Sequence, residues 1–184
     1  WGKSVANGFS FCALTGKKEV MNLGGINRPG QEKVFLISTT HGGETHAIGA
    51  GLATIDFYKK NNVIQQNQAT GNAVIKGCND IINKKGLSKN IELSPSPWFI
   101  IYIFKNTLLE VDSGYRTLFM QEMIKNGVLF QGAFVPSYSH NEEEITFFMN
   151  AFEKSCDTYV KALQDGYAKY LIGEPAKPVF RKIL

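Results

Sequence analysis

The sequence predicts an α/β chain that ends in a compact α+β domain. Two short apolar segments near the N-terminus, Phe9–Leu14 and Lys33–Thr40, are typical of strands buried in a sheet. Several later segments repeat apolar residues at helical spacing. From about residue 62 the expected order is helix, strands, helix, strand, helix, which favours a small layered domain.

The first 60 residues look different from the rest. Two strands joined by the loop Gly24–Gln31 have no strand partners of their own, so we expect residues 1–42 to be the end of a larger sheet. A helix should follow from Gly43 to about Lys60, because Ile48, Leu52 and Ile55 recur on one face. Alanines and glycines crowd its first half, which indicates close packing there.

Glycines, prolines and capping residues mark the boundaries of the later elements. We expect a helix from about residue 62 to Gly86, two strands within Asn90–Lys105, a helix over Ser113–Gly127, an irregular or strand-like stretch over Val128–Ser139 and a last helix. That last helix should begin at Asn141, because Glu144 follows three residues later in a capping-box pattern.

Composition argues against nucleic-acid binding, a membrane-spanning helix and a disulfide framework. The net charge of +4 is scattered, and no basic stripe with interleaved aromatics predicts nucleic-acid binding. The longest apolar run, Trp98–Phe104, is far shorter than the ~20 residues of a membrane helix. Cys12, Cys78 and Cys156 are odd in number and far apart, so we interpret them as buried reduced thiols of a cytoplasmic protein, with no disulfide and no metal site.

Lys3 is the first candidate functional residue, and three interpretations compete for it. Gly2-Lys3-Ser4 could end a phosphate-binding P-loop, but such a loop requires a helix directly after the lysine, and the sequence here alternates like a strand. Lys3 could be an ordinary surface lysine, or it could form a Schiff base with a cofactor. Lys3 alone does not decide between these two.

Two motifs favour the cofactor lysine. The segment GKSVANGFSFCALTGKKEVM resembles the surroundings of the Schiff-base lysine in class III aminotransferases, which are pyridoxal-phosphate enzymes of fold type I. The second segment, STTHGGE at Ser38–Glu44, is similar to the family's Thr-x-Gly-Gly segment. Without Lys3, TTHGG would indicate only a turn before a helix. The remainder of the chain, including HNEEEI, resembles the C-terminal small domain of the glutamate-1-semialdehyde aminomutase branch.

The resemblance implies a cofactor site. Lys3 would form the Schiff base with pyridoxal 5'-phosphate, and Thr40, with Gly42 and Gly43, would bind the phosphate of the cofactor in the neighbouring subunit. The active unit would then be a homodimer with a shared active site. The family's phosphate loop, stacking aromatic and pyridine-nitrogen aspartate precede the lysine, so we expect the N-terminal part of the same enzyme to supply them.

The resemblance also bears on the substrate. Many family members clamp a substrate carboxylate with a small-domain arginine, but this chain has none between Arg116 and Arg181. The aminomutase branch lacks that arginine too, although its members usually carry an acidic residue where Gln131 stands. Gln131 is therefore a candidate substrate-binding residue. The implied function is amino-group transfer, as an aminotransferase or an aminomutase, on a small amino or oxo compound.

Together these observations predict two parts. Residues 1–61 would be the end of the pyridoxal-phosphate-binding large domain with its connecting helix, and residues 62–184 would be the C-terminal small domain. The alternative function is a non-catalytic assembly or interaction module that keeps the small-domain fold. The sequence upstream of Lys3 would separate the two, because an aspartate about one strand and loop earlier supports the enzyme.

Overall fold

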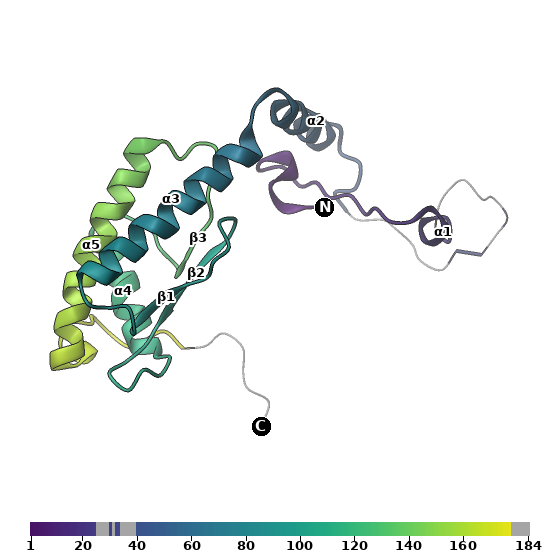
Figure 1. The fold of residues 1–184 in the computed structure, drawn as a ribbon. Helices are drawn as coiled ribbons and strands as arrows, with labels where there is room; N and C mark the ends of the chain where they lie inside the picture. The colour runs from purple at the N-terminus through teal and green to yellow at the C-terminus, as the bar shows by residue number, and fades with distance from the viewer. Residues whose placement is uncertain (25–29, 31, 34–39, 178–184) are drawn as a thin grey trace. The chain divides into compact units, whose positions relative to one another are not determined.

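The computed structural model describes residues 1–24, 30, 32–33 and 40–177 (Figure 1). The chain divides into two compact units, Trp1–Asn62 and Val63–Leu184, which we describe separately. Their assignment to a large and a small domain stays a prediction.

The second unit is built on a three-stranded antiparallel sheet in the order β1-β2-β3. Its strands are β1 (Ile91–Leu93), β2 (Ile100–Phe104) and β3 (Ala133–Phe134). Side chains alternate along β2, so that Ile100, Tyr102 and Phe104 are buried while Ile101 and Ile103 are exposed. One face of the sheet therefore belongs to the core, and Pro95 and Pro97 lie between β1 and β2.

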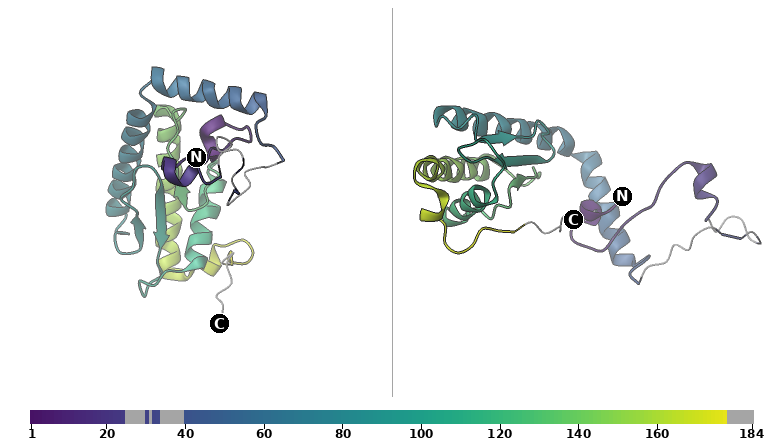
Figure 2. Two further views of the ribbon diagram at one scale, coloured as in Figure 1. Left: turned by 90° about the vertical axis from the view of Figure 1, so that its right-hand side faces the viewer. Right: turned by 90° about the horizontal axis from the view of Figure 1, so that it is seen from below.

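Three helices cover the buried face of this sheet (Figure 2). They are α3 (Val63–Lys84), α4 (Ser113–Lys125) and α5 (Glu142–Asp165), and the short 3-10 helix η2 (Tyr167–Lys169) follows. Their inward side chains include Cys78, Phe119, Phe152 and Tyr159, all fully buried. The ring of Phe119 packs edge-on against Phe152 at 5.1 Å between centroids. The α+β architecture expected for this part of the chain is therefore present.

The predicted capping box of α5 is confirmed. The Asn141 side chain accepts a hydrogen bond from the Glu143 backbone N–H at 2.8 Å, and Glu144 Oε2 accepts one from the Asn141 backbone N–H at 2.9 Å. These contacts satisfy N–H groups that have no partner within the helix. The N-cap of α4 is simpler, because the Asp112 side chain accepts hydrogen bonds from the Gly114 and Tyr115 backbone N–H groups without a reciprocal bond.

The first unit consists of the 3-10 helix η1 (Lys3–Ala6), the one-turn α1 (Lys18–Met21) and α2 (Thr45–Lys60). Helix η1 packs against α2, where Ala47 and Gly51 are buried. A Cβ added to Gly51 would lie 3.7 Å from the ring of Phe11. The close packing expected from the small residues of this helix is therefore present.

The strand predicted over Phe9–Leu14 is wrong, because these residues are irregular. A strand needs a neighbour to satisfy its backbone hydrogen bonds, and the described residues of the first unit contain no strand. Phe9 and Leu14 are 51% and 64% exposed. The strand predicted over Lys33–Thr40 cannot be compared, since residues 34–39 lie outside the described part.

The burial predicted for the cysteines is found in the second unit but not in the first. Cys78 and Cys156 are buried reduced thiols in the second unit, as predicted. Cys12 is exposed, which corrects the prediction for this residue. The prediction places Cys12 in a strand at the end of a larger sheet, whereas the described residues of the first unit contain no strand. Among the helices of the described ranges, none combines the length and apolar character needed to cross a bilayer.

Candidate active site

Lys3 is the first residue of η1 and has an unusual backbone. Its φ of +57° lies in the left-handed region, which costs a non-glycine residue about 1 kcal/mol or more. The turn that ends η1 is also left-handed, at Asn7 (φ +45°) and Gly8 (φ +111°), which are residue types that accept this conformation. Buried Ala6 anchors η1 on the unit. The sequence Ala6-Asn7-Gly8 thus forms a tight turn directly after the lysine.

The Lys3 side chain is accessible. Lys3 is exposed, and within the described part of the chain no carboxylate forms an ion pair with it. A four-residue 3-10 helix and then a turn follow the lysine, whereas a P-loop requires an α-helix there. The backbone thus disfavours the P-loop interpretation and leaves a free amine.

The second predicted segment forms the turn that leads into α2. Thr40, Gly42 and Gly43 are all exposed, and Gly43 has a φ of +76°, where any other residue would be strained. Glu44 occupies the N-cap position of α2 but makes no side-chain capping bond. The first N–H groups of α2 therefore lack a side-chain acceptor among the described residues. Free N–H groups and the helix dipole favour an anion at such a position.

A cluster of His41, Glu44 and His46 lies beside this turn, and sequence reasoning missed it. His41 Nδ1 donates to Glu44 Oε1 at 2.9 Å, and His46 Nε2 lies 3.3 Å from Glu44 Oε2. The hydrogen bond from His41 lowers the pKa of the Glu44 carboxyl, and the nearby imidazoles add to this effect. The two histidines and a glutamate within six residues were the sequence signal.

The same cluster connects the two predicted segments. The ring of His46 packs edge-on against Phe9, with centroids 5.5 Å apart. Lys3 thus begins a helix that packs on α2, and the Thr40–Gly43 turn leads into the first residue of α2. Four of the five predicted site residues therefore lie next to helix α2: Lys3 in the helix that packs on it, and Thr40, Gly42 and Gly43 in the turn that precedes it.

Gln131 lies in the second unit, in the loop before β3, and is exposed. Its backbone carbonyl accepts a hydrogen bond from Arg116 Nη2 at 2.7 Å. Arg116 therefore holds the Gln131 loop through its backbone, and the Gln131 side chain is free of this contact.

Comparison with known proteins tests the resemblance. No protein-family model matches the sequence. The chain is 25% identical over 166 residues to a 3-aminobutyryl-CoA aminotransferase of Cloacimonas acidaminovorans, covering 89% of this chain and 38% of that protein. It is 26% identical over 160 residues to the glutamate-1-semialdehyde 2,1-aminomutase of Methanococcoides burtonii, covering 82% of this chain and 36% of that protein.

Solved structures give the same result for the fold. A transaminase with pyridoxal phosphate bound matches with a TM-score of 0.71 at 16% identity, over 88% of this chain and 37% of that one. The FumI protein of Sphingopyxis sp. MTA144, in a pyridoxal-phosphate form, matches with a TM-score of 0.61 at 12% identity, over 75% and 33%. The predicted resemblance to class III aminotransferases is confirmed.

The fold class is confirmed as well. Mixed helices and a small antiparallel sheet match the C-terminal part of the pyridoxal-phosphate transaminases. The chain spans a little more than a third of the length of the curated relatives that it matches. The roles of Lys3, Thr40, Gly42, Gly43 and Gln131 stay predictions.

Proposed function

We propose that this chain belongs to an enzyme that transfers amino groups with pyridoxal 5'-phosphate, as an aminotransferase or an aminomutase. The observation that carries the proposal is the exposed Lys3 amine at the start of η1, which packs on helix α2 and is followed by the tight Asn7–Gly8 turn. Sequence similarity to an aminotransferase and to aminomutases supports the reaction class. A cytoplasmic location and a small amino or oxo substrate are part of the same proposal.

The residues of the first unit fit the cofactor. The uncapped N-terminus of α2 offers backbone N–H groups to a phosphate, and Gly42 and Gly43 have no side chains to block its approach. Thr40 Oγ1 would donate a further hydrogen bond. Glu44, the nearest carboxylate in sequence, is held by His41 and His46, which offsets its repulsion of an anion.

Lys3 has the role that its chemistry allows. Pyridoxal phosphate, when bound, supplies an aldehyde for an amine and a ring that accepts electron density. The exposed Lys3 Nζ can bind the aldehyde covalently. As a free amine, Lys3 Nζ can also accept a proton from the substrate carbon and return it at the next position. The left-handed backbone of Lys3 and the Asn7-Gly8 turn set the position on the main chain from which the Lys3 side chain extends.

The proposal includes a homodimer in which Thr40 contacts the phosphate on the neighbouring subunit. Helix α2 exposes Ile48, Leu52 and Ile55, which gives an apolar face for another part of the assembly. The relatives are more than twice as long as this chain. We therefore assign the remaining cofactor contacts to the N-terminal part of the same enzyme, and Gln131 to the substrate side.

Reductive labelling tests the lysine. The native protein is incubated with limiting pyridoxal phosphate, reduced with borohydride and mapped by peptide mass spectrometry. Lys3 should carry the label, and Lys3→Ala should lose it, whereas the matched variant Lys17→Ala in the same segment should keep it. A label spread over surface lysines such as Lys17 would reject the role of Lys3 and favour the non-catalytic module.

Complementation tests the shared site. Thr40→Val should weaken cofactor binding, and Thr39→Val, which changes the adjacent hydroxyl, should have less effect. Mixed Thr40→Val and Lys3→Ala subunits should form heterodimers with one intact site and recover activity. Demonstrated heterodimers without recovered activity would exclude a shared site.

A further inference from the structure

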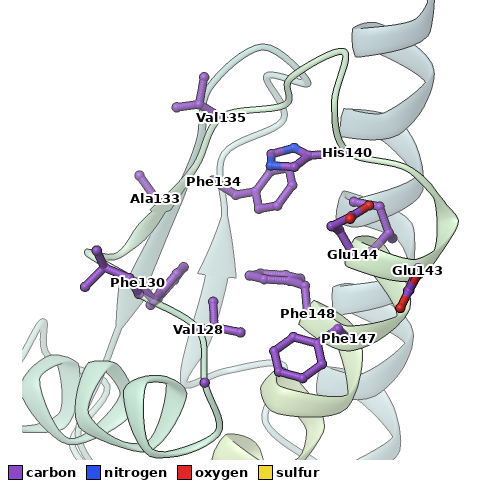
Figure 3. Close-up of a pocket in the computed structure, with 13 residues that line it drawn as sticks. Val128, Phe130, Ala133, Phe134, Val135, His140, Glu143, Glu144, Phe147 and Phe148 are labelled. Carbon is purple, nitrogen blue, oxygen red and sulfur yellow. The ribbon is translucent and has the colours of Figure 1, made fainter.

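The second unit contains an open pocket of about 510 Å³ between the turn after α4, the β3 strand and the start of α5 (Figure 3). Its walls are mainly apolar. They include Val128, Leu129, Phe130, Phe134, Phe147 and Phe148. A pocket of this size suits a small organic molecule.

The floor of this pocket is aromatic and fixed. Phe148 is 5% exposed and packs against Phe134 at 4.9 Å between ring centroids. Phe130, 2% exposed, lies at 6.3 Å from Phe148. The outer wall is open, because Phe147 is 54% exposed. The pocket thus offers the accessible Phe147 ring and the Leu129 side chain to an aromatic or branched aliphatic group, over a floor of buried rings.

The charged side chains that line the pocket are both acidic, Glu143 and Glu144. Glu144 lies above Phe148 and beside His140 (Figure 3). One Glu144 oxygen, Oε2, accepts the Asn141 backbone N–H at 2.9 Å, and the other has no hydrogen bond among the described residues. His140 Nδ1 accepts the Ser137 backbone N–H at 3.1 Å, so a neutral His140 carries its proton on Nε2.

We propose that this pocket binds an apolar amine in its protonated form. The ammonium group would lie against the free oxygen of Glu144, in the negative field of Glu143, with the apolar body on the aromatic floor. Carboxylates stabilise a cation at this position, and aromatic faces add cation–π attraction. An anion is disfavoured, because the acidic first turn of α5 offsets the attraction of the helix N-terminus.

This inference goes beyond amino-group transfer and does not rest on it, because it concerns binding by residues 127–148 alone. It is tested without pyridoxal phosphate on the full chain. The probes are 2-phenylethylamine and its uncharged analogue 2-phenylethanol, each titrated while NMR follows the side chains of His140 and Phe147. The amine should bind about threefold to tenfold more tightly than the alcohol, as expected for a partly exposed charge pair.

Two glutamate variants separate the pocket charge from general charge effects. Glu144→Gln removes the charge but keeps the capping bond, since glutamine also serves at this position of a capping box. It should weaken amine binding about fivefold and leave alcohol binding unchanged. Glu142→Gln removes the same charge from the same helical turn, outside this pocket, and should change neither affinity by more than about twofold.

A third variant tests the apolar part. Phe147→Ala should weaken both probes, because it removes an open wall ring that the fold does not bury. Equal affinity for amine and alcohol would overturn the proposal, as would an equal effect of Glu144→Gln and Glu142→Gln. The titration contains no pyridoxal phosphate and follows only residues of the second unit, so failure of the cofactor proposal and failure of this one are distinguishable.

Discussion

Gly71 of α3 lies directly against the backbone of Pro97, in the connection between β1 and β2. A Cβ added to Gly71 would come 2.0 Å from the Pro97 carbonyl oxygen, which is well inside van der Waals contact. The close approach lets the proline-containing loop rest on the helix. A glycine in the middle of α3, unfavourable by helix propensity, thus has a packing reason.

Gly71→Ala should destabilise the second unit. Alanine favours a helix by about 1 kcal/mol over glycine, but the clash is with backbone, which cannot rotate away. Overpacking of this kind costs about 1–3 kcal/mol, so we expect a net loss of up to about 2 kcal/mol in the free energy of unfolding. Urea denaturation followed by circular dichroism measures it.

Gly77→Ala is the matched control in the same helix. Its added Cβ would lie 2.9 Å from Met149 Cε, the end of a flexible side chain that can move. We expect Gly77→Ala to be neutral or slightly stabilising. Equal destabilisation by the two variants would show that helix propensity and local packing have been misjudged at Gly71.

The three cysteines should differ in reactivity. Burial raises the pKa of the Cys78 thiol to about 12 and also raises that of Cys156, whereas Cys12 is exposed. The thiolate is the reactive form, so iodoacetamide at about pH 8 should modify Cys12 alone in the folded chain. Mass spectrometry after brief exposure measures this, and denaturant should make all three react. Modification of Cys156 at the rate of Cys12 would contradict the burial.

Local sequence patterns predicted the elements of the second unit well. In the first unit they failed to predict the structure of Phe9–Leu14. The α5 capping box and the Val74–Cys78 face of α3 involve residues only three or four positions apart, so both could be predicted from the sequence. Phe9–Leu14 has the composition of a strand, but pairing is decided by partners far away in sequence, which no local pattern contains. The His41–Glu44–His46 cluster was missed because its geometry depends on the turn before α2.

Asn141→Ala should weaken the start of α5. The variant removes an acceptor for the Glu143 and Glu144 backbone N–H groups, and loss of such a cap costs about 0.5–2 kcal/mol. Asn150→Ala, at an exposed position inside the same helix, is the control and should be neutral or slightly stabilising. Urea denaturation of both variants measures the difference. Equal stability of the two would argue against the capping box in solution.

The last prediction concerns pH at the turn before α2. Glu44 has a lowered pKa in the folded chain, first because His41 donates a hydrogen bond to its carboxylate. A carboxyl with a lowered pKa adds stability above the pKa that it has in the unfolded chain, about 4.3. That contribution is lost as the pH falls through the lower, folded pKa. The ordered turn should therefore loosen as the pH falls through this lowered pKa.

Carbon NMR of the Glu44 carboxyl during a pH titration measures this directly. His41→Ala removes the largest cause of the shift, so the Glu44 pKa should rise toward its ordinary value. His46→Ala should raise it less, because His46 contributes only a smaller charge effect. About 1 M salt should reduce that charge effect, since Glu44 is accessible to ions. A Glu44 pKa that His41→Ala leaves unchanged would show that the hydrogen bond between His41 and Glu44 does not hold the turn in solution.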